Sequence, residues 1–116
     1  MRFMLLLHRR ESELLQRTPE WIEEVVGFLA RFDDELLSRS ELEWTETLDS
    51  DTQAEVVGPG GEHRDGWYNE AGKPLRRIWV VRVPDRARAH ELAGQLAGEL
   101  DTWVEVRECL PGAQRP

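Results

Sequence analysis

Cysteine, lysine and long apolar runs are scarce in this chain. Cys109 is the single cysteine among 116 residues, which excludes an internal disulfide and a thiolate metal site within one chain. Lys73 is the single lysine, so arginine carries nearly all of the positive charge. The apolar run at residues 3–7 is shorter than a membrane helix or the apolar region of a signal peptide requires. We therefore expect a cytoplasmic protein without a membrane partner.

Basic side chains are also fewer than acidic ones. The chain has 23 acidic side chains against 15 lysines and arginines, and its formal net charge is -8. An acidic surface repels the phosphates of nucleic acids and of anionic lipids. The arginines at 76–77 and 86–88 are local exceptions, and charge at strand ends and helix starts is typically solvated. We expect no nucleic-acid partner.

Motifs for common cofactors and catalytic centres are missing. His8, His63 and His90 have no metal-ligand spacing. The glycine cluster at 58–61 contains a proline and is followed by neither a helix signal nor a lysine, so it is a turn and not a phosphate-binding loop. Serine-hydrolase, dinucleotide-binding and redox motifs are absent. We predict neither a metal nor another cofactor.

Apolar periodicity predicts one α+β domain over residues 1–110, followed by a flexible tail at 111–116. Thr18 and Pro19, a hydroxyl cap followed by proline, predict the start of a helix of about five turns. Pro84 and Asp85 open a second helix. A continuous apolar run, alternation and β-branched composition predict strands at 2–8, 41–48, 53–57, 77–83 and 102–108. Residues 9–17 and 63–74 are predicted to be a polar connection and a long loop.

This order of elements predicts a ferredoxin-like βαββαβ arrangement, in which an antiparallel sheet carries two helices on one face. The other face would then expose apolar side chains, and Trp44, Trp79 and Trp103 are strand residues that add to this surface. Soluble monomers rarely expose so much apolar area. We therefore predict a homodimer in which two sheets pack face to face about a twofold axis.

Three segments of the sequence carry a family resemblance. Residues 2–7 (RFMLLL), 64–67 (RDGW) and 103–107 (WVEVR) occur in the order and rough spacing of the YCII-related, or DGPF, proteins, and the chain resembles that family over nearly its whole length. The resemblance implies a ferredoxin-like fold that dimerises through its sheets, as in the dimeric α-β barrel proteins. Some members are thought to use a His–Asp pair in a cleft, and a few relatives are lyases. Trp67 and Tyr68 stand where the family has Pro-Phe.

The segment around Asp65 contains the most chemically suggestive residues. A histidine beside a carboxylate can act as a general base, and His63 and Asp65 share a face if the segment is extended. His8, at the end of the first strand, is predicted as an alternative base facing Asp65, and the competing interpretation is a hydrogen-bonded strand-end residue. The competing interpretation is a plain turn, in which Asp65 caps the backbone and Gly66 supplies a positive φ.

Aromatic side chains complete the candidate site. Gly66, Trp67, Tyr68 and Trp79 are predicted to contact a small organic ligand, because such sites are lined by aromatic residues with a few polar groups. The leading hypothesis is a YCII-like homodimer with a small cleft between the sheet, the first helix and the Asp65 loop, and with lyase- or isomerase-like acid–base chemistry. The alternative is a non-catalytic interaction or regulatory domain whose tryptophans serve dimerisation.

Overall fold

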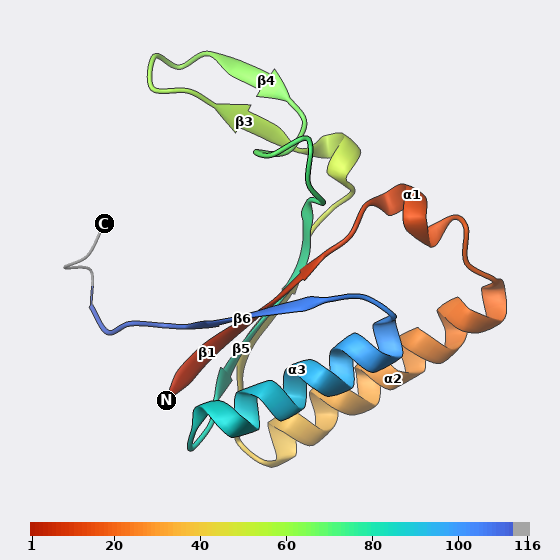
Figure 1. Ribbon diagram of the computed structural model, residues 1–116, viewed down its shortest axis with the longest axis vertical. Coiled ribbons are helices and arrows are strands. Elements are labelled where there is room, and N and C mark those ends of the chain that lie inside the picture. Colours follow the sequence, from red (N-terminus) through yellow and green to blue (C-terminus); the bar gives the residue numbers. More distant parts are fainter. Residues whose placement is uncertain (113–116) are drawn as a thin grey trace.

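Four strands form one antiparallel sheet in the computed structural model, which describes residues 1–112 (Figure 1). The strand order is β2-β5-β1-β6, and every neighbouring pair is antiparallel. The strands are β1 (Arg2–His8), β2 (Leu42–Thr47), β5 (Leu75–Arg82) and β6 (Val104–Glu108). Residues 113–116 of the predicted tail lie outside the described residues.

The two long helices begin where the sequence predicts. In α2 (Pro19–Ser38), the Thr18 hydroxyl accepts a hydrogen bond of 3.1 Å from the backbone nitrogen of Trp21. In α3 (Arg86–Leu100), the carboxylate of Asp85 accepts a hydrogen bond of 2.9 Å from the backbone nitrogen of Arg88. A third, four-residue helix, α1 (Glu11–Leu14), lies within the segment predicted to be a polar connection. Its single turn gives no apolar periodicity by which to recognise it.

The helices α2 and α3 lie side by side against the same face of the sheet (Figure 1). Leu5 pairs with Trp79 and Val106, and these three side chains point toward the helices. The core between sheet and helices consists of Phe3, Leu5, Leu7, Val25, Phe32, Leu36, Trp79, Val81, Val83, Ala89, Leu92, Ala93, Leu96 and Leu100. The predicted α+β class with an antiparallel sheet and helices is confirmed.

The segment between β2 and β5 forms a separate projection, which we call the arm (residues 49–74). It contains a short 3-10 helix, η1 (Asp51–Gln53), and a hairpin of β3 (Glu55–Val57) and β4 (His63–Asp65). The two hairpin strands pair only with each other. The prediction of a loop over 63–74 is wrong for its first three residues, because a His-Arg-Asp strand has no apolar alternation that would identify it.

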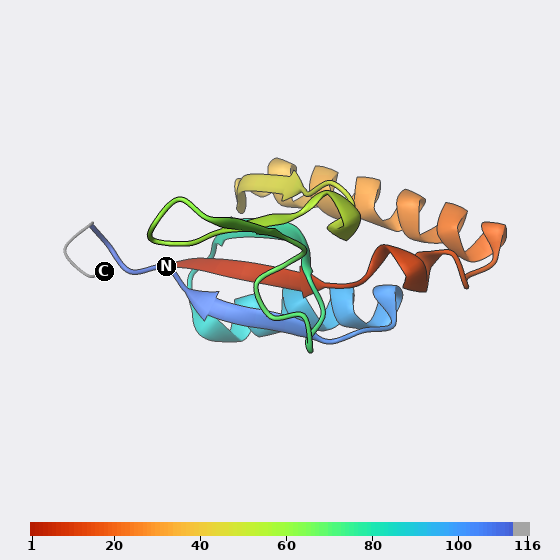
Figure 2. The same cartoon turned by 90° about the horizontal axis from the view of Figure 1, so that it is seen from above.

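The arm makes the molecule extended. It projects beyond the sheet on the side away from α2 and α3 (Figure 1), and Figure 2 shows the flattened profile. The radius of gyration of the Cα atoms is 15.7 Å, whereas a compact domain of this length has about 13 Å. Among residues 1–112, no helix combines the length and the apolar character needed to cross a membrane.

Candidate functional site

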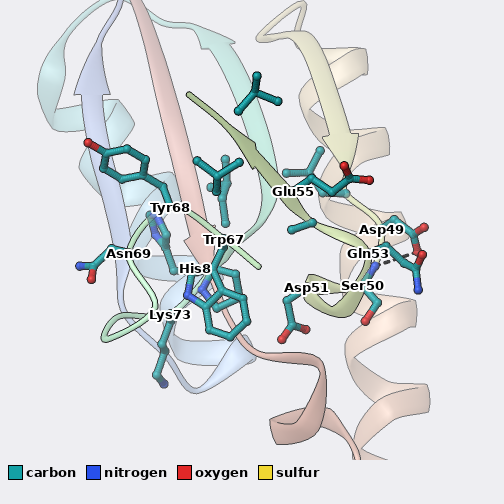
Figure 3. A pocket seen from close by; sticks show the side chains of 16 residues that line it. His8, Asp49, Ser50, Asp51, Gln53, Glu55, Trp67, Tyr68, Asn69 and Lys73 are labelled. Atoms are coloured by element: carbon teal, nitrogen blue, oxygen red, sulfur yellow. Dashed lines mark hydrogen bonds between the residues drawn. The ribbon is translucent and has the colours of Figure 1, made fainter. Parts of the chain in front are cut away.

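A cleft of about 750 Å³ lies between the arm and the end of the sheet. It opens on the sheet face away from the helices, where His8 projects from the end of β1 (Figure 3). The sheet contributes His8 and Leu75 to the lining of the cleft. Leu48 lies just before the arm, and all other lining residues belong to the arm. The labelled polar and aromatic lining residues are His8, Asp49, Ser50, Asp51, Gln53, Glu55, Trp67, Tyr68, Asn69 and Lys73.

One side of the cleft is formed by rings. His8 and Trp67 lie close together in Figure 3, with Tyr68 beside them. The indole nitrogen of Trp67 donates a hydrogen bond of 2.9 Å to the backbone oxygen of Gly72, and the guanidinium of Arg10 lies 5.4 Å from the Trp67 ring. These contacts fix the ring in place. Within residues 1–112, the side chain of Tyr68 makes no comparable contact, and this residue remains 88% exposed at the rim.

The opposite side of the cleft is acidic. The carboxylate of Asp51 accepts a hydrogen bond of 2.8 Å from the backbone nitrogen of Glu11, which ties the arm to α1. Asp49 accepts a bond of 2.7 Å from the backbone nitrogen of Ser50 (dashed in Figure 3), and the Ser50 hydroxyl caps η1. Glu55 of β3 adds a third carboxylate. The cleft thus offers carboxylates opposite aromatic rings, a combination that binds polar organic molecules.

The sequence reasoning missed this acidic wall. The available signal was the polar run at residues 49–53 between two predicted strands, where Asp and Ser are typical capping and turn residues. Capping residues are common in connections, and nothing in the sequence shows that this connection folds back toward the end of β1. The same holds for Lys73 and Asn69, which line the cleft from the loop after β4.

Among the predicted catalytic residues, His8 lines the cleft, whereas His63 and Asp65 do not. His63 is exposed on β4, and its Nδ1 lies 3.9 Å from Oε2 of Glu55 on the paired strand. Within residues 1–112, no hydrogen bond or ion pair joins Asp65 to His8 or His63. The pairing of Asp65 with a histidine therefore stays a prediction.

The predicted ligand-binding residues divide between cleft, turn and core. Trp67 and Tyr68 line the cleft. Gly66 has a φ of +110° and donates a backbone hydrogen bond of 2.8 Å to Ala54, so the predicted positive φ at the turn is confirmed. Trp79 is fully buried in the core, where its indole nitrogen donates a bond of 2.9 Å to Asp33. This corrects its placement in a ligand site, because alternation along β5 directs it toward the helices.

The position of the cleft also differs from expectation. The sequence predicted that the first helix would form one wall, but α2 contributes no lining residue, since it packs on the other face of the sheet. Within residues 1–112, no group of three or more histidine, cysteine, aspartate or glutamate side chains is arranged to hold a metal ion.

The sequence matches no model of a known protein family and no curated protein. The resemblance to the YCII-related family therefore stays a prediction, carried by the three segments given above.

Proposed function

We propose that this protein is a YCII-like homodimer of ferredoxin-like βαββαβ subunits, and that its arm cleft binds a small organic ligand. The observation that carries the proposal is the uncovered face of the sheet, which has an apolar centre and lies next to a cleft whose aromatic rim is exposed. A partner subunit on this face would bury the apolar centre and close the open side of the cleft.

The apolar centre follows from the strand register. On the face away from the helices, Met4 of β1 pairs with Val80 of β5, which pairs with Trp44 of β2. In the next row, Leu6 pairs with Ile78. Within residues 1–112 no helix covers this face: Trp44 is 48% exposed and Met4, Leu6 and Ile78 are half-buried, whereas Val80 is already buried between its neighbours. Two such faces packed together form the interior of a sandwich.

The edges of the same face are charged, which supports the pairing of two sheets in one defined orientation over non-specific aggregation. Glu105 and Arg107 of β6 lie opposite Leu6 and Met4, and Glu46 of β2 lies opposite Ile78. An apolar centre with a charged rim is the usual composition of a protein interface. The strand order β2-β5-β1-β6, with a helix after β1 and another after β5, supports the ferredoxin-like topology.

For the chemistry, we propose lyase- or isomerase-like proton transfer with His8 as the base. Of the predicted catalytic residues, it is the one that reaches the cleft in the described chain. Asp65, as its orienting partner, belongs to the arm, so the proposed pair requires the arm to close onto the end of β1. Closure of a loop over a bound substrate is a common way to complete a catalytic site.

A non-catalytic interaction domain is the second candidate, and Trp103 favours it. This side chain is 93% exposed just before the edge strand β6, and it lies outside the arm cleft. Tryptophan is enriched at protein interfaces. In this alternative, Trp44 and Trp103 contact other subunits or proteins, and the arm cleft has no ligand.

The dimer is tested by sedimentation velocity at micromolar concentration. The wild type is expected to sediment as a dimer, and Ile78→Glu as a monomer, because it places a charge in the centre of the interface. Leu37→Glu is the matched control, since Leu37 is 58% exposed on α2 and lies outside the proposed interface. A monomeric wild type, or equal behaviour of the two variants, would overturn the sheet-to-sheet dimer.

The ligand is tested by a thermal-shift screen of small organic compounds on the wild type. Compounds that raise the melting temperature are then titrated against Trp67→Ala, which removes one wall of the cleft, and against Trp103→Ala, which leaves the cleft unchanged. Loss of binding in the first variant alone supports the arm cleft. Binding that survives Trp67→Ala, or a screen without any stabilising compound, favours the interaction domain.

A further inference from the structure

A second cavity, of about 300 Å³, lies on the other side of the sheet, between the helical layer and the ends of β1 and β5. It shares no lining residue with the arm cleft. Its walls are mostly apolar, with Leu7 from β1, Ile22 and Val25 from α2, and Leu100 at the end of α3 among the lining residues.

The charged residues that line this cavity are all arginines, namely Arg9, Arg76 and Arg77. Two of them have carboxylate partners outside the cavity lining. Arg76 pairs with Glu11 at 3.0 Å, and Arg77 pairs with Asp33 at 2.6 Å. Arg9 has a more distant partner, Glu13, whose carboxylate lies 3.7 Å from its Nε.

Arg9 is buried, and its side chain is 3% exposed. Its Nη2 donates to the backbone oxygen of Leu100 and, at 3.4 Å, to that of Asp101, at the C-terminal end of α3. The guanidinium also lies 5.6 Å from the ring of Trp21. Its Nε and Nη1 are buried and have no hydrogen-bond partner among residues 1–112. Buried donors without acceptors are rare in proteins and costly, most of all when they carry charge.

The nearest carboxylate does not satisfy these donors. Oε2 of Glu13 lies 3.7 Å from Nε of Arg9, beyond hydrogen-bond distance. Glu13 is instead engaged by Lys73, whose Nζ lies 3.2 Å from its carboxylate. Burial lowers the pKa of the Arg9 guanidinium, but an arginine stays protonated at neutral pH. The cavity therefore combines apolar walls with one cation that needs an acceptor.

We infer that this cavity binds a small monocarboxylate with an apolar body, whose carboxylate accepts hydrogen bonds from the free nitrogens of Arg9. A carboxylate supplies the acceptors that Nε and Nη1 of Arg9 lack, and guanidinium groups match carboxylate oxygens geometrically. The apolar walls accommodate a ring or a short branched chain, and a volume of about 300 Å³ is at the small end of ligand sites. The site does not depend on dimerisation or on the arm cleft, so it can be tested whether or not the proposed function holds.

The test measures the affinity of the full chain for phenylacetate by isothermal titration calorimetry, with phenylacetamide as the neutral match of the same shape. Phenylacetate is expected to bind at least about tenfold more tightly, because hydrogen bonds to a charged group discriminate by that factor or more. Equal affinities, or no binding of phenylacetate at millimolar concentration, would overturn the inference.

Three variants locate the site. Arg9→Gln is expected to abolish the preference for the acid over the amide, whereas Arg17→Gln is expected to keep it, because Arg17 also lies over the Trp21 ring but does not line the cavity. Glu13→Gln is expected to bind phenylacetate roughly threefold more tightly, since it removes the carboxylate nearest to Arg9.

Arg9 also caps α3, so Arg9→Gln is checked for folding by circular dichroism. If it unfolds, the comparison of acid and amide on the wild type and the gain in Glu13→Gln still decide the matter. Unchanged or weaker binding of phenylacetate in Glu13→Gln, or equal losses in the Arg9 and Arg17 variants, would show that the acid does not bind at Arg9.

Discussion

Asp33 of α2 is the residue whose replacement should reveal most about the packing of helix on sheet. Its two carboxylate oxygens hold two side chains of β5: Oδ2 accepts a bond of 2.6 Å from Arg77, and Oδ1 accepts a bond of 2.9 Å from the indole nitrogen of Trp79. Trp79 is fully buried and Arg77 lies 4.6 Å over its ring. Asp33→Ala therefore leaves a buried donor and a half-buried cation without their acceptor.

The expected loss follows from these two contacts. A buried donor left without an acceptor costs about 1–3 kcal/mol. The ion pair adds roughly 1 kcal/mol, a value discounted because water reaches both partners, whose side chains are 15% and 21% exposed. We expect Asp33→Ala to lower the free energy of unfolding by about 3 kcal/mol, which corresponds to roughly 12 °C in melting temperature. Asp33→Asn keeps an acceptor for Trp79 and should lose only about half as much.

The assay is urea unfolding followed by circular dichroism, at neutral pH and low salt. Asp34→Ala is the matched control, since it is an exposed neighbour in the same helix and gains the same helix propensity. It should change the free energy of unfolding by less than about 0.5 kcal/mol. If Asp33→Ala costs no more than Asp34→Ala, the carboxylate does not hold the helix to the sheet and the reasoning fails.

The remaining predictions concern one ion pair and two glycines. The hydrogen bonds from Arg88 lower the pKa of Glu41. The stability that they supply is therefore present above the usual carboxyl pKa and is lost as the pH falls through the lowered value. In urea unfolding, Glu41→Gln should be less stable than wild type by about 1–2 kcal/mol at pH 7, and this difference should shrink below about pH 4. Gly94→Ala should raise the free energy of unfolding by up to about 1 kcal/mol, because a methyl group there meets no atom and alanine favours the helix. Gly66→Ala should lower it by about 1 kcal/mol, because its φ of +110° strains any side chain.

Each of these predictions has a contrary outcome. A pH-independent difference between Glu41→Gln and wild type would show that the ion pair does not titrate with folding. A destabilised Gly94→Ala would indicate that another chain packs closely against α3 at this point. A Gly66→Ala variant as stable as wild type would mean that the turn after β4 adopts another conformation in solution.

The architecture of the sheet and helices was predictable because local signals and burial agree. Thr18 and Asp85 cap helices whose apolar stripes repeat with helical spacing, and the run of β-branched and aromatic residues in β5 belongs to a central strand. Where no apolar pattern exists, as in β4, the strand was not predicted. Residues 63–65 are all exposed, and they pair with β3 mainly through backbone bonds, which composition does not encode.

The sites were less predictable because they depend on contacts distant in sequence. His8 and Trp67 both line the arm cleft although they are 59 positions apart in the sequence, and no periodicity links a strand end to a loop. Arg9 follows an apolar strand and would normally be placed in solvent. Its burial depends on the carbonyl groups at the end of α3, 91 residues further along the chain.

The arm's hairpin pairs only with itself, and this has a consequence for how the protein opens. Backbone hydrogen bonds of β3 and β4 end within the hairpin, so their loss leaves the four-stranded sheet and its core intact. Amide protons of residues 55–57 and 63–65 should therefore exchange with solvent through a local opening of low free energy, while those of β1 and β5 exchange only on global unfolding. Mutations that alter the rate at which the hairpin opens therefore need not alter the stability of the domain, and under the proposed function this opening would affect how fast the arm cleft exchanges its ligand.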